Sequence, residues 1–228
     1  MISGHPHPIT VVLERLIEYF TVYGFEVFEG PEVETEANNF DRLNIPADHP
    51  VREEHDTFFL TSGLLLRTHT SPMQLRIMDH RQAPIRALVP GRVFRNESTD
   101  STHNHTFNQL EGFVLDENAN MEQLITTLKG MLNHLMGGRM RFRVRPSYFP
   151  FVEPGIELDL FHRGKFVEVL GAGMIHPNVL AAMNVDQSKY TGWAFGVGIE
   201  RLLNLVSDVE DARLNLSGDY RYSGQFKC

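Results

Sequence analysis

The sequence predicts an α+β fold, with one domain over residues 1–228 and an antiparallel β-sheet flanked by helices. Apolar residues follow the period of a helix in four segments, whereas the stretches between them favour strands. No βαβ unit repeats along the chain, so the sheet is expected to be mostly antiparallel. The 228 residues, of which 42% are hydrophobic and 22% charged, suffice for a single core.

Each predicted helix has recognisable ends and buries one apolar stripe. Pro8 suits the first turn of the first helix and Gly24 its stop. The stripe of this helix consists of Ile9, Val12, Leu13, Leu16, Ile17 and Phe20. The four helices are residues 8–23, a helix starting at Thr70-Ser71-Pro72, a helix from the cap Asn120 to Gly137, and one starting near Gly198.

Strands are predicted where apolar residues alternate with polar ones or form short runs. The stretch 38–56 is polar, contains two prolines and is expected to be a long loop. A second polar loop, 98–105, joins the two central strands. The predicted strands are residues 25–29, 57–60, 85–97, 106–116, 139–145, 155–161 and 165–170.

Charge and composition exclude several classes of protein. No apolar run approaches the roughly 20 residues that span a bilayer, and residues 1–7 do not resemble a signal peptide, so no membrane partner is expected. Cys228 is the single cysteine, which fits a reducing cytoplasm and allows neither a disulfide framework nor a zinc cluster. The net charge of −8 indicates that any RNA is held partly by another chain or by a local patch.

A polar cluster lies on the two central strands. Arg95 and Glu97 are two residues apart and share one sheet face, and so do Phe107, Gln109 and Glu111 on the next strand. This mixture suits a nucleotide site. A guanidinium group binds phosphate oxygens, an aromatic ring stacks on a base, and carboxylates bind amino groups or a metal ion. The same pattern also fits a solvated sheet face with one stray aromatic residue.

Two further segments suggest a ligand site. GWAFGVGIER, residues 192–201, places small residues at a strand-to-helix corner and Arg201 in the first helical turn. RPSYFPFVEP, residues 145–154, separates Phe149 from Phe151 by a proline, so that the two rings suit the wall of a rigid apolar pocket. The alternatives are a glycine corner used only for packing, a surface pair of Glu200 with Arg201, and two ordinary core phenylalanines.

Taken in order, these segments resemble the three signature motifs of class II aminoacyl-tRNA synthetases. Residues 8–31 are similar to motif 1, GRVFRNESTDSTHNHTFNQLEG to motif 2 and GVGIER to motif 3. Within the class, the resemblance is to the alpha subunit of phenylalanyl-tRNA synthetase and covers essentially all 228 residues. It rests on GHPHP, NFDRLNIPADHP, LLRTHTSP, RPSYFPFVEP, EVLGAGMIHPNVL and GWAFGVGIERL.

This resemblance implies an ATP site with Arg95 and Arg201 as the catalytic residues. Arg95 would hold the α-phosphate and Arg201 the γ-phosphate end. Phe107 would stack on adenine and Glu97 would contact its amino group. His103, in the loop of motif 2, would reach the phosphates. No side-chain nucleophile is needed, because positioning and charge neutralisation carry adenylate formation.

The resemblance also implies an amino-acid site and a metal. The residues that would bind the ammonium and carboxylate groups are His69, Ser71, Gln109 and Glu111. The residues that would enclose the phenyl ring are Phe149, Phe151, Ala194 and the backbone of Gly171, Ala172 and Gly173. Glu153 matches a position linked to Mg²⁺, and Glu168 is a second candidate.

The function implied is activation of L-phenylalanine with ATP and Mg²⁺, followed by transfer to the acceptor end of tRNA(Phe). The expected partner is a beta subunit in an α₂β₂ heterotetramer. Two alternatives stay open: a stand-alone paralogue that makes aminoacyl-adenylate for an acceptor other than tRNA, and a non-catalytic module that binds ATP or phenylalanine.

The sequence departs from the family pattern in three places. It lacks the N-terminal coiled-coil arm of the family, as expected of a trimmed chain or of a natural short form. Asn108 stands where a histidine is frequent. Residues 215–218 lack the usual aromatic pair, which bears on the contact with the partner subunit.

Overall fold

A computed structural model of the chain describes residues 6–53, 56–96, 104–207, 209, 211–216 and 218–226. Its centre is a seven-stranded sheet in the order β1-β4-β5-β9-β8-β7-β6. The two-residue strand β1 pairs with β4 in parallel, and every other neighbouring pair is antiparallel. The predicted α+β class is confirmed. The strands are β1 (Glu26–Val27), β4 (Ile85–Phe94), β5 (Thr106–Asp116), β6 (Phe142–Phe149), β7 (Val152–His162), β8 (Lys165–Ile175) and β9 (Thr191–Gly198).

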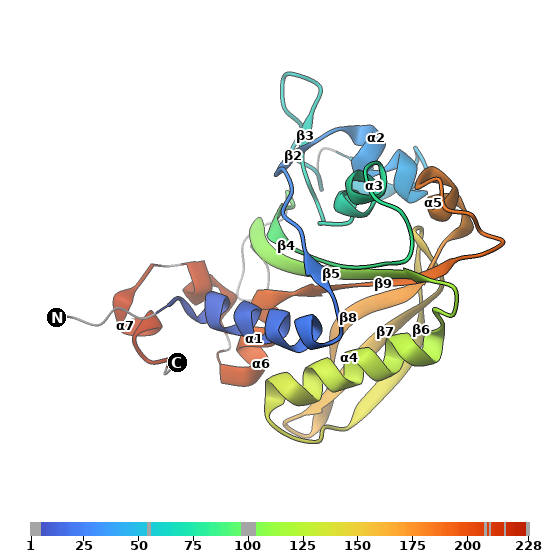
Figure 1. Cartoon of the computed structure of the whole chain (residues 1–228). Helices are drawn as coiled ribbons and strands as arrows, with labels where there is room; N and C mark the ends of the chain where they lie inside the picture. Colours follow the sequence, from blue (N-terminus) through green and yellow to red (C-terminus); the bar gives the residue numbers. More distant parts are fainter. Residues whose placement is uncertain are drawn as a thin grey trace.

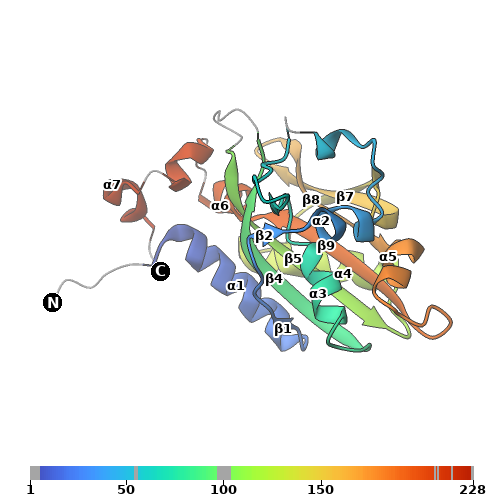
Figure 2. The same ribbon diagram turned by 90° about the horizontal axis from the view of Figure 1, so that it is seen from above.

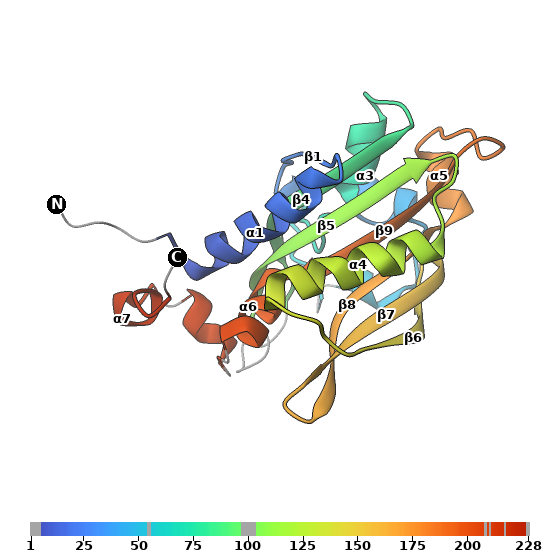
Figure 3. The same ribbon diagram turned by 60° about the horizontal axis from the view of Figure 1, so that its bottom comes forward.

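Helices cover both faces of this sheet. Three long helices lie across one face, as Figures 1 and 3 show: α1 (Pro8–Val22), α4 (Met121–Met136) and α6 (Ile199–Ser207). Shorter elements lie over the other face and partly cover it in the view from above (Figure 2): α2 (Glu36–Asn39), α3 (Pro72–Met78) and α5 (Pro177–Ala182). None of the described helices is long and apolar enough to cross a membrane.

The central strand β5 shows why the core lies on both faces. Leu110 and Val114 point into the cluster under the three long helices, whereas Phe113 and Leu115 point into the cluster under the short elements. Both faces are therefore buried here, and residues 112–115 are apolar without interruption. Asn108, Gln109 and Glu111 come before this apolar run.

The predicted helix ends are confirmed in α1 and α4. His7 caps α1 by accepting a hydrogen bond from the Ile9 N–H at 3.2 Å. Asn120 caps α4 in the same way from the Gln123 N–H at 3.0 Å. Gly137 ends α4 in the left-handed conformation, with φ of 70°, which glycine adopts without a steric penalty.

The prediction of a long loop at 38–56 was wrong in part. The structure has helix α2 and the short helical turns η1 (Asp41–Leu43) and η2 (Pro50–Arg52) here. Phe40, Leu43 and Ile45 are buried in the second core cluster. Turns of three or four residues are too short to show a helical period, so the sequence pattern shows only the polar residues between the apolar anchors.

Several predicted strands differ from the observed ones. The strand at 57–60 is reduced to a single bridge between Phe59 and Leu65, and 25–29 to the two residues of β1. Strand β6 starts three residues later than predicted and continues to Phe149. Strand β7 is longer than predicted at both ends, and β8 is longer at its C-terminal end. The other elements whose bounds no pattern predicted are β2 (Val33–Glu34), β3 (Leu65–Leu66), α5, β9, η3 (Ala212–Leu216) and α7 (Tyr220–Ser223). For β9 the sequence indicated only a strand-to-helix corner within residues 192–201.

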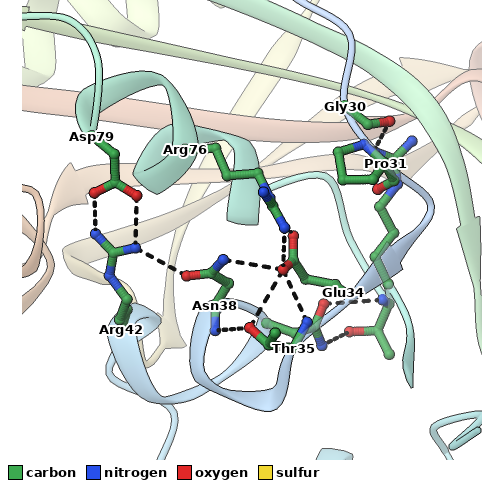
Figure 4. Close-up of polar contacts among 11 residues, drawn as sticks. Gly30, Pro31, Glu34, Thr35, Asn38, Arg42, Arg76 and Asp79 are labelled. Atoms are coloured by element: carbon green, nitrogen blue, oxygen red, sulfur yellow. Dashed lines mark hydrogen bonds and ion pairs between the residues drawn. The ribbon is translucent and has the colours of Figure 1, made fainter. Parts of the chain in front are cut away.

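A buried carboxylate braces the short elements above the sheet (Figure 4). Glu34 accepts two hydrogen bonds from Arg76 of α3, at 2.7 and 2.8 Å, and further bonds from Thr35 N and Asn38 Nδ2 at the start of α2. Burial raises the pKa of Glu34, but these donors outweigh it and the pKa is lowered overall. The brace therefore keeps α3, which contributes to the candidate active site, fixed against α2.

Candidate active site

Two neighbouring cavities lie on the sheet face that carries the short elements. The larger, of about 550 Å³, is called the aromatic cavity, and the smaller, of about 270 Å³, the arginine cavity. The residues that line both are Arg95, Gln109, Glu168, Gly171 and Gly196. Further residues of the aromatic cavity are His69, Ser71, Gln74, Glu111, Phe149, Phe151 and Ala194. Further residues of the arginine cavity are Phe107, Gly198, Glu200 and Arg201.

Two phenylalanines form one wall of the aromatic cavity. The rings of Phe149 and Phe151 lie 5.9 Å apart and nearly parallel, and the His69 ring lies 6.0 Å from Phe151 in the same orientation. The carbonyl oxygen of Pro150, between the two phenylalanines, accepts a hydrogen bond from Asn44 Nδ2 at 2.6 Å. This contact holds the wall in place, so the cavity is shaped for a flat apolar group.

The floor of the cavity requires small residues. A Cβ at Gly171 would lie 2.7 Å from Cζ of Phe149, and a Cβ at Gly196 would lie 2.7 Å from Nε2 of Gln109. Ala194 is buried on the neighbouring strand. Glycine at 171 and 196 therefore lets the phenylalanine wall and the glutamine approach the sheet closely.

A buried carboxylate lies at the polar end of the aromatic cavity. Glu111 is 2% exposed and accepts hydrogen bonds from the Ser71 hydroxyl and from Gln74 Nε2. Burial raises the pKa of Glu111 to about 7, although both hydrogen bonds and the charge of Arg67 act in the opposite direction. An ammonium group in this cavity would supply the counter-charge that this carboxylate needs.

His69 is a neutral acceptor. Its Nε2 lies 3.1 Å from the carbonyl oxygen of Asn39, which can only accept, so Nε2 carries the proton. Burial first, and then the charge of Arg95, lower the pKa of His69 to about 3, so the ring stays neutral. Nδ1 is therefore left with a lone pair for a donor.

Three buried polar atoms at this cavity have no hydrogen-bond partner within the described part of the chain. They are His69 Nδ1, Gln74 Oε1 and Gln109 Oε1, all acceptors on residues that line the aromatic cavity. Because a buried acceptor without a donor costs about 1–3 kcal/mol, their grouping indicates a ligand with several N–H or O–H donors.

The arginine cavity brings together a ring and two guanidinium groups. The Arg95 guanidinium lies over the Phe107 ring, 5.0 Å from its centroid, and its Nε donates to the carbonyl oxygen of Thr68 at 3.3 Å. Arg201, in the first turn of α6, donates to the carbonyl oxygen of Glu168 at 3.1 Å and lies 3.3 Å from its carboxylate. The arrangement suits an anion joined to a flat ring.

Glu200 does not form a surface pair with Arg201, so that alternative is excluded. Glu200 is 6% exposed and accepts hydrogen bonds from the Asn108 backbone N–H at 2.9 Å and from Asn108 Nδ2 at 2.8 Å. Burial raises the pKa of Glu200 in spite of these bonds. The contact joins the start of α6 to β5, which places Arg201 relative to Phe107, and it gives Asn108 a defined role.

Not every predicted site residue lies at these cavities. Glu97 and His103 are outside the described residues. The Glu153 side chain is 74% exposed, lies 3.3 Å from His176 and lines neither cavity. Gly173 also lines neither, because it packs against Val152 and Pro154. The other predicted residues line one cavity or both.

The sequence patterns missed Gln74, Gly196 and a pair of charged residues, Arg145 and Glu157. Gln74 lies one helical turn after Ser71 on the same face of α3, a spacing that predicts a shared partner. Glu157 and Arg145 face each other across β6 and β7, and no local signal predicts such a pairing.

The described carboxylates at the cavities are too dispersed for a metal site built by these residues alone. Within the described residues, no three His, Cys, Asp or Glu side chains gather closely enough to hold a metal ion. Of the two predicted metal ligands, Glu168 lines both cavities and Glu153 lines neither.

Comparison with known proteins gives a consistent result. Residues 1–226 match the family model for the tRNA synthetases class II core domain (F). The chain is 48% identical over 226 residues to the phenylalanine–tRNA ligase alpha subunits of Vibrio cholerae and Aeromonas hydrophila. These matches cover 99% of this chain and 69% of each relative. The corresponding protein of Idiomarina loihiensis is 48% identical over 224 residues.

Proposed function

The chain belongs to the phenylalanine–tRNA ligase alpha subunits, within the class II tRNA synthetases, and we propose that it condenses L-phenylalanine with ATP to form phenylalanyl-adenylate. The observation that carries this proposal is the pair of adjoining cavities. One has a phenylalanine wall and a buried carboxylate, and the other has two arginines and a ring. Their shared lining lets one ligand react with the other.

In the aromatic cavity, the phenyl ring of the substrate packs against Phe149 and Phe151 above Ala194. The ammonium group lies against Glu111, which supplies a counter-charge, and against the lone pair of His69 Nδ1. Gln109, which lines both cavities, contributes its unpartnered Oε1. Binding in this orientation directs the carboxylate group of the amino acid toward Arg95.

In the arginine cavity, Phe107 stacks on the adenine ring and Arg95 holds the α-phosphate. Arg201 takes the γ-phosphate end. Adenylate formation then needs only alignment: a carboxylate oxygen of phenylalanine forms a bond to the α-phosphorus, the bond between that phosphorus and the bridging oxygen breaks, and pyrophosphate leaves with the electron pair. The two guanidinium groups stabilise the charge that develops on the phosphate oxygens.

The donor set fits a magnesium ion that binds together with ATP. Mg²⁺ commonly binds through one or two carboxylates plus phosphate oxygens and water, and Glu168 is a carboxylate at the junction of both cavities. Glu168 would hold the ion, whose charge would neutralise the triphosphate. Glu153 would join it only if its segment moved, because its side chain is exposed and outside both cavities.

The tRNA and the partner subunit are supported by the relatives. Their printed name describes alpha subunits that ligate phenylalanine to tRNA, which supports transfer of the phenylalanyl group to tRNA(Phe) here, with a beta subunit in an α₂β₂ assembly. The formal net charge of −8 agrees with an RNA that is held largely by another chain. A cytoplasmic location is part of the same proposal.

Pyrophosphate exchange tests the first step. The chain, with a beta subunit from one of these relatives, is expected to exchange labelled pyrophosphate into ATP when phenylalanine is present. Tyrosine and leucine serve as control amino acids. Exchange that needs no amino acid, or that responds equally to all three, would contradict the proposal. Exchange without transfer to tRNA(Phe) would point instead to another acceptor.

The closeness of Gly171 to Phe149 gives a prediction for the aromatic cavity. Gly171→Ala adds a Cβ that would lie 2.7 Å from the phenylalanine ring, so the ring must tilt into the cavity. We expect the KM for phenylalanine to rise by about tenfold, which is 1.4 kcal/mol, with the KM for ATP changed by less than about twofold. Gly138→Ala, where a Cβ meets nothing within 4 Å, is the control. An unchanged KM for phenylalanine in the Gly171 variant would show that the ring does not border the substrate.

A further inference from the structure

A row of charged side chains crosses the sheet beside the two cavities. It runs from β6 across β7 and β8, which are neighbouring strands in Figure 3, to Arg201 at the start of α6. Asp159, on β7, is 1% exposed although it lies on the sheet face that leads to the cavities. A buried carboxylate needs partners, and the proposed chemistry does not use this one.

Two arginines of the edge strand β6 satisfy Asp159. Arg143 donates from Nε at 2.8 Å, and Arg145 donates from Nε at 2.9 Å and from Nη2 at 3.1 Å. These bonds hold the pKa of Asp159 below its ordinary value, with the bond from Arg145 the largest cause. The two arginines are two residues apart on one strand, so they share a face.

Of the two arginines, Arg145 is the one that also contacts carboxylates lining the cavities. Arg145 Nη2 lies 2.6 Å from the carboxylate of Glu157 and 3.7 Å from that of Glu168. Glu168 in turn lies 3.3 Å from Arg201 Nη1. The guanidinium of Arg143 has a different neighbour, because it lies over the Phe166 ring, 4.6 Å from its centroid.

We propose that Arg145, anchored by Asp159, is a positioning residue for the ATP site: it fixes the carboxylate of Glu168 and, through it, the guanidinium of Arg201. This inference rests on the proposed function, because it assigns Glu168 and Arg201 to the triphosphate and its metal ion. Glu168 and Arg201 are each about half exposed, so their own packing does not fix them. The planar guanidinium of Arg145 is held by Asp159 on one edge, and its Nη2 faces Glu157 and Glu168. It therefore restricts the positions that the Glu168 carboxylate can adopt.

The alternative is that Arg145 merely neutralises Asp159 within the sheet. Arg143 also serves this purpose, since its Nε donates to the same carboxylate at 2.8 Å and its Nη2 lies 2.6 Å from it. The two arginines therefore form a matched pair: same strand, same face and same anchor, with a link to Glu168 in one alone.

Substitution by lysine separates the two explanations. Arg145→Lys keeps the positive charge on an exposed edge strand, so the fold is expected to survive, but an ammonium group cannot hold Asp159 and face Glu168 as the fork does. We expect the KM for ATP in pyrophosphate exchange to rise by about fivefold to tenfold, with the KM for phenylalanine within about twofold of the original. Arg143→Lys is expected to change either KM by less than about twofold.

A direct binding measurement and a second variant complete the experiment. Calorimetric titration with MgATP, in the absence of amino acid, is expected to show the same loss for Arg145→Lys and for Asp159→Asn. In a Glu168→Gln background, Asp159→Asn is expected to add no further loss of ATP affinity, because its effect passes through the carboxylate of Glu168.

The outcomes are distinct. Equal effects of the two lysine substitutions, equal rises in both KM values, or additive losses in the Glu168→Gln background would overturn the positioning role alone. Absence of phenylalanine-dependent exchange in the unsubstituted protein would overturn the proposed function and this inference with it.

Discussion

Replacing Arg95 by alanine is expected to lower kcat for phenylalanine-dependent pyrophosphate exchange by about 10²- to 10³-fold. Arg95 lines both cavities, and its guanidinium lies over Phe107, where the α-phosphate of a stacked adenine nucleotide would meet the substrate carboxylate. Charge develops on the phosphate in the transition state, so the loss falls mainly on kcat. The dissociation constant of phenylalanine, measured by calorimetry, is expected to change by less than about threefold.

Arg92→Ala is the matched control for this experiment. Arg92 is on the same strand region, but its side chain is 57% exposed and lies 4.0 Å from Glu32, away from the two cavities. Its removal is expected to alter kcat by less than about twofold. If Arg95→Ala instead raised the KM for phenylalanine and left kcat unchanged, Arg95 would belong to the amino-acid site rather than to the phosphate site.

The hairpin of β4 and β5 shows which features of the site the local sequence pattern predicts. Alternation along two adjacent strands predicted that Arg95, Phe107, Gln109 and Glu111 share a face, and the structure places all four at the cavities. This inference succeeds because side chains two apart in a strand must point the same way, whatever the rest of the fold does. Glu97, on the same predicted strand, lies outside the described residues.

Contacts between segments far apart in the sequence were not predictable in this way. Asn108 and Glu200 are 92 residues apart, and neither has a local pattern that favours a buried pair over two surface residues. The row through Arg145 and Glu168 likewise depends on the order of β6, β7 and β8 in the sheet. Periodicity reports which face a residue occupies, but it does not identify the residue opposite.

Short elements without a period were missed for a related reason. The turns at 41–43 and 50–52 are held by the apolar anchors Phe40 and Ile45, which reach the second core cluster from a polar stretch. Their helical form follows from that tertiary contact, since isolated helical turns of this length are unstable in water.

Replacing Glu111 by glutamine is expected to raise the dissociation constant of phenylalanine by about 10²-fold, which corresponds to about 2.7 kcal/mol. In the proposed function this buried carboxylate is the counter-charge for the ammonium group, and a charge-assisted bond to a buried group is stronger than a neutral one. Gln74 adapts to the new amide, because its Oε1 has no partner among the described residues and a flipped side chain would accept from it. Glu26→Gln, at an exposed position on β1, is the control and is expected to leave phenylalanine binding unchanged.

The same substitution is expected to stabilise the ligand-free fold at high pH, because the pKa of Glu111 is raised in the folded chain. Burial raises that pKa from 4.5 to about 7, so between these values the folded chain holds a proton that the unfolded chain has released. The free energy of unfolding therefore falls as pH rises through this window, by an amount on the order of 3 kcal/mol, and Glu111→Gln removes that loss. The variant should have a higher Tm than the unsubstituted chain at pH 8 and a similar Tm at pH 4.5.

We expect phenylalanine to reverse the balance, because its ammonium group would stabilise the charged carboxylate. In the unsubstituted chain its affinity is expected to fall by up to about tenfold for each pH unit below 7, where binding must first remove a proton from Glu111. The Gln variant should bind weakly with no such slope. Thermal unfolding and calorimetric titration from pH 5 to 8 measure both effects. A variant that is less stable at pH 8 than the unsubstituted chain would indicate that Glu111 serves the fold, and that the hydrogen bonds from Ser71 and Gln74 outweigh its desolvation.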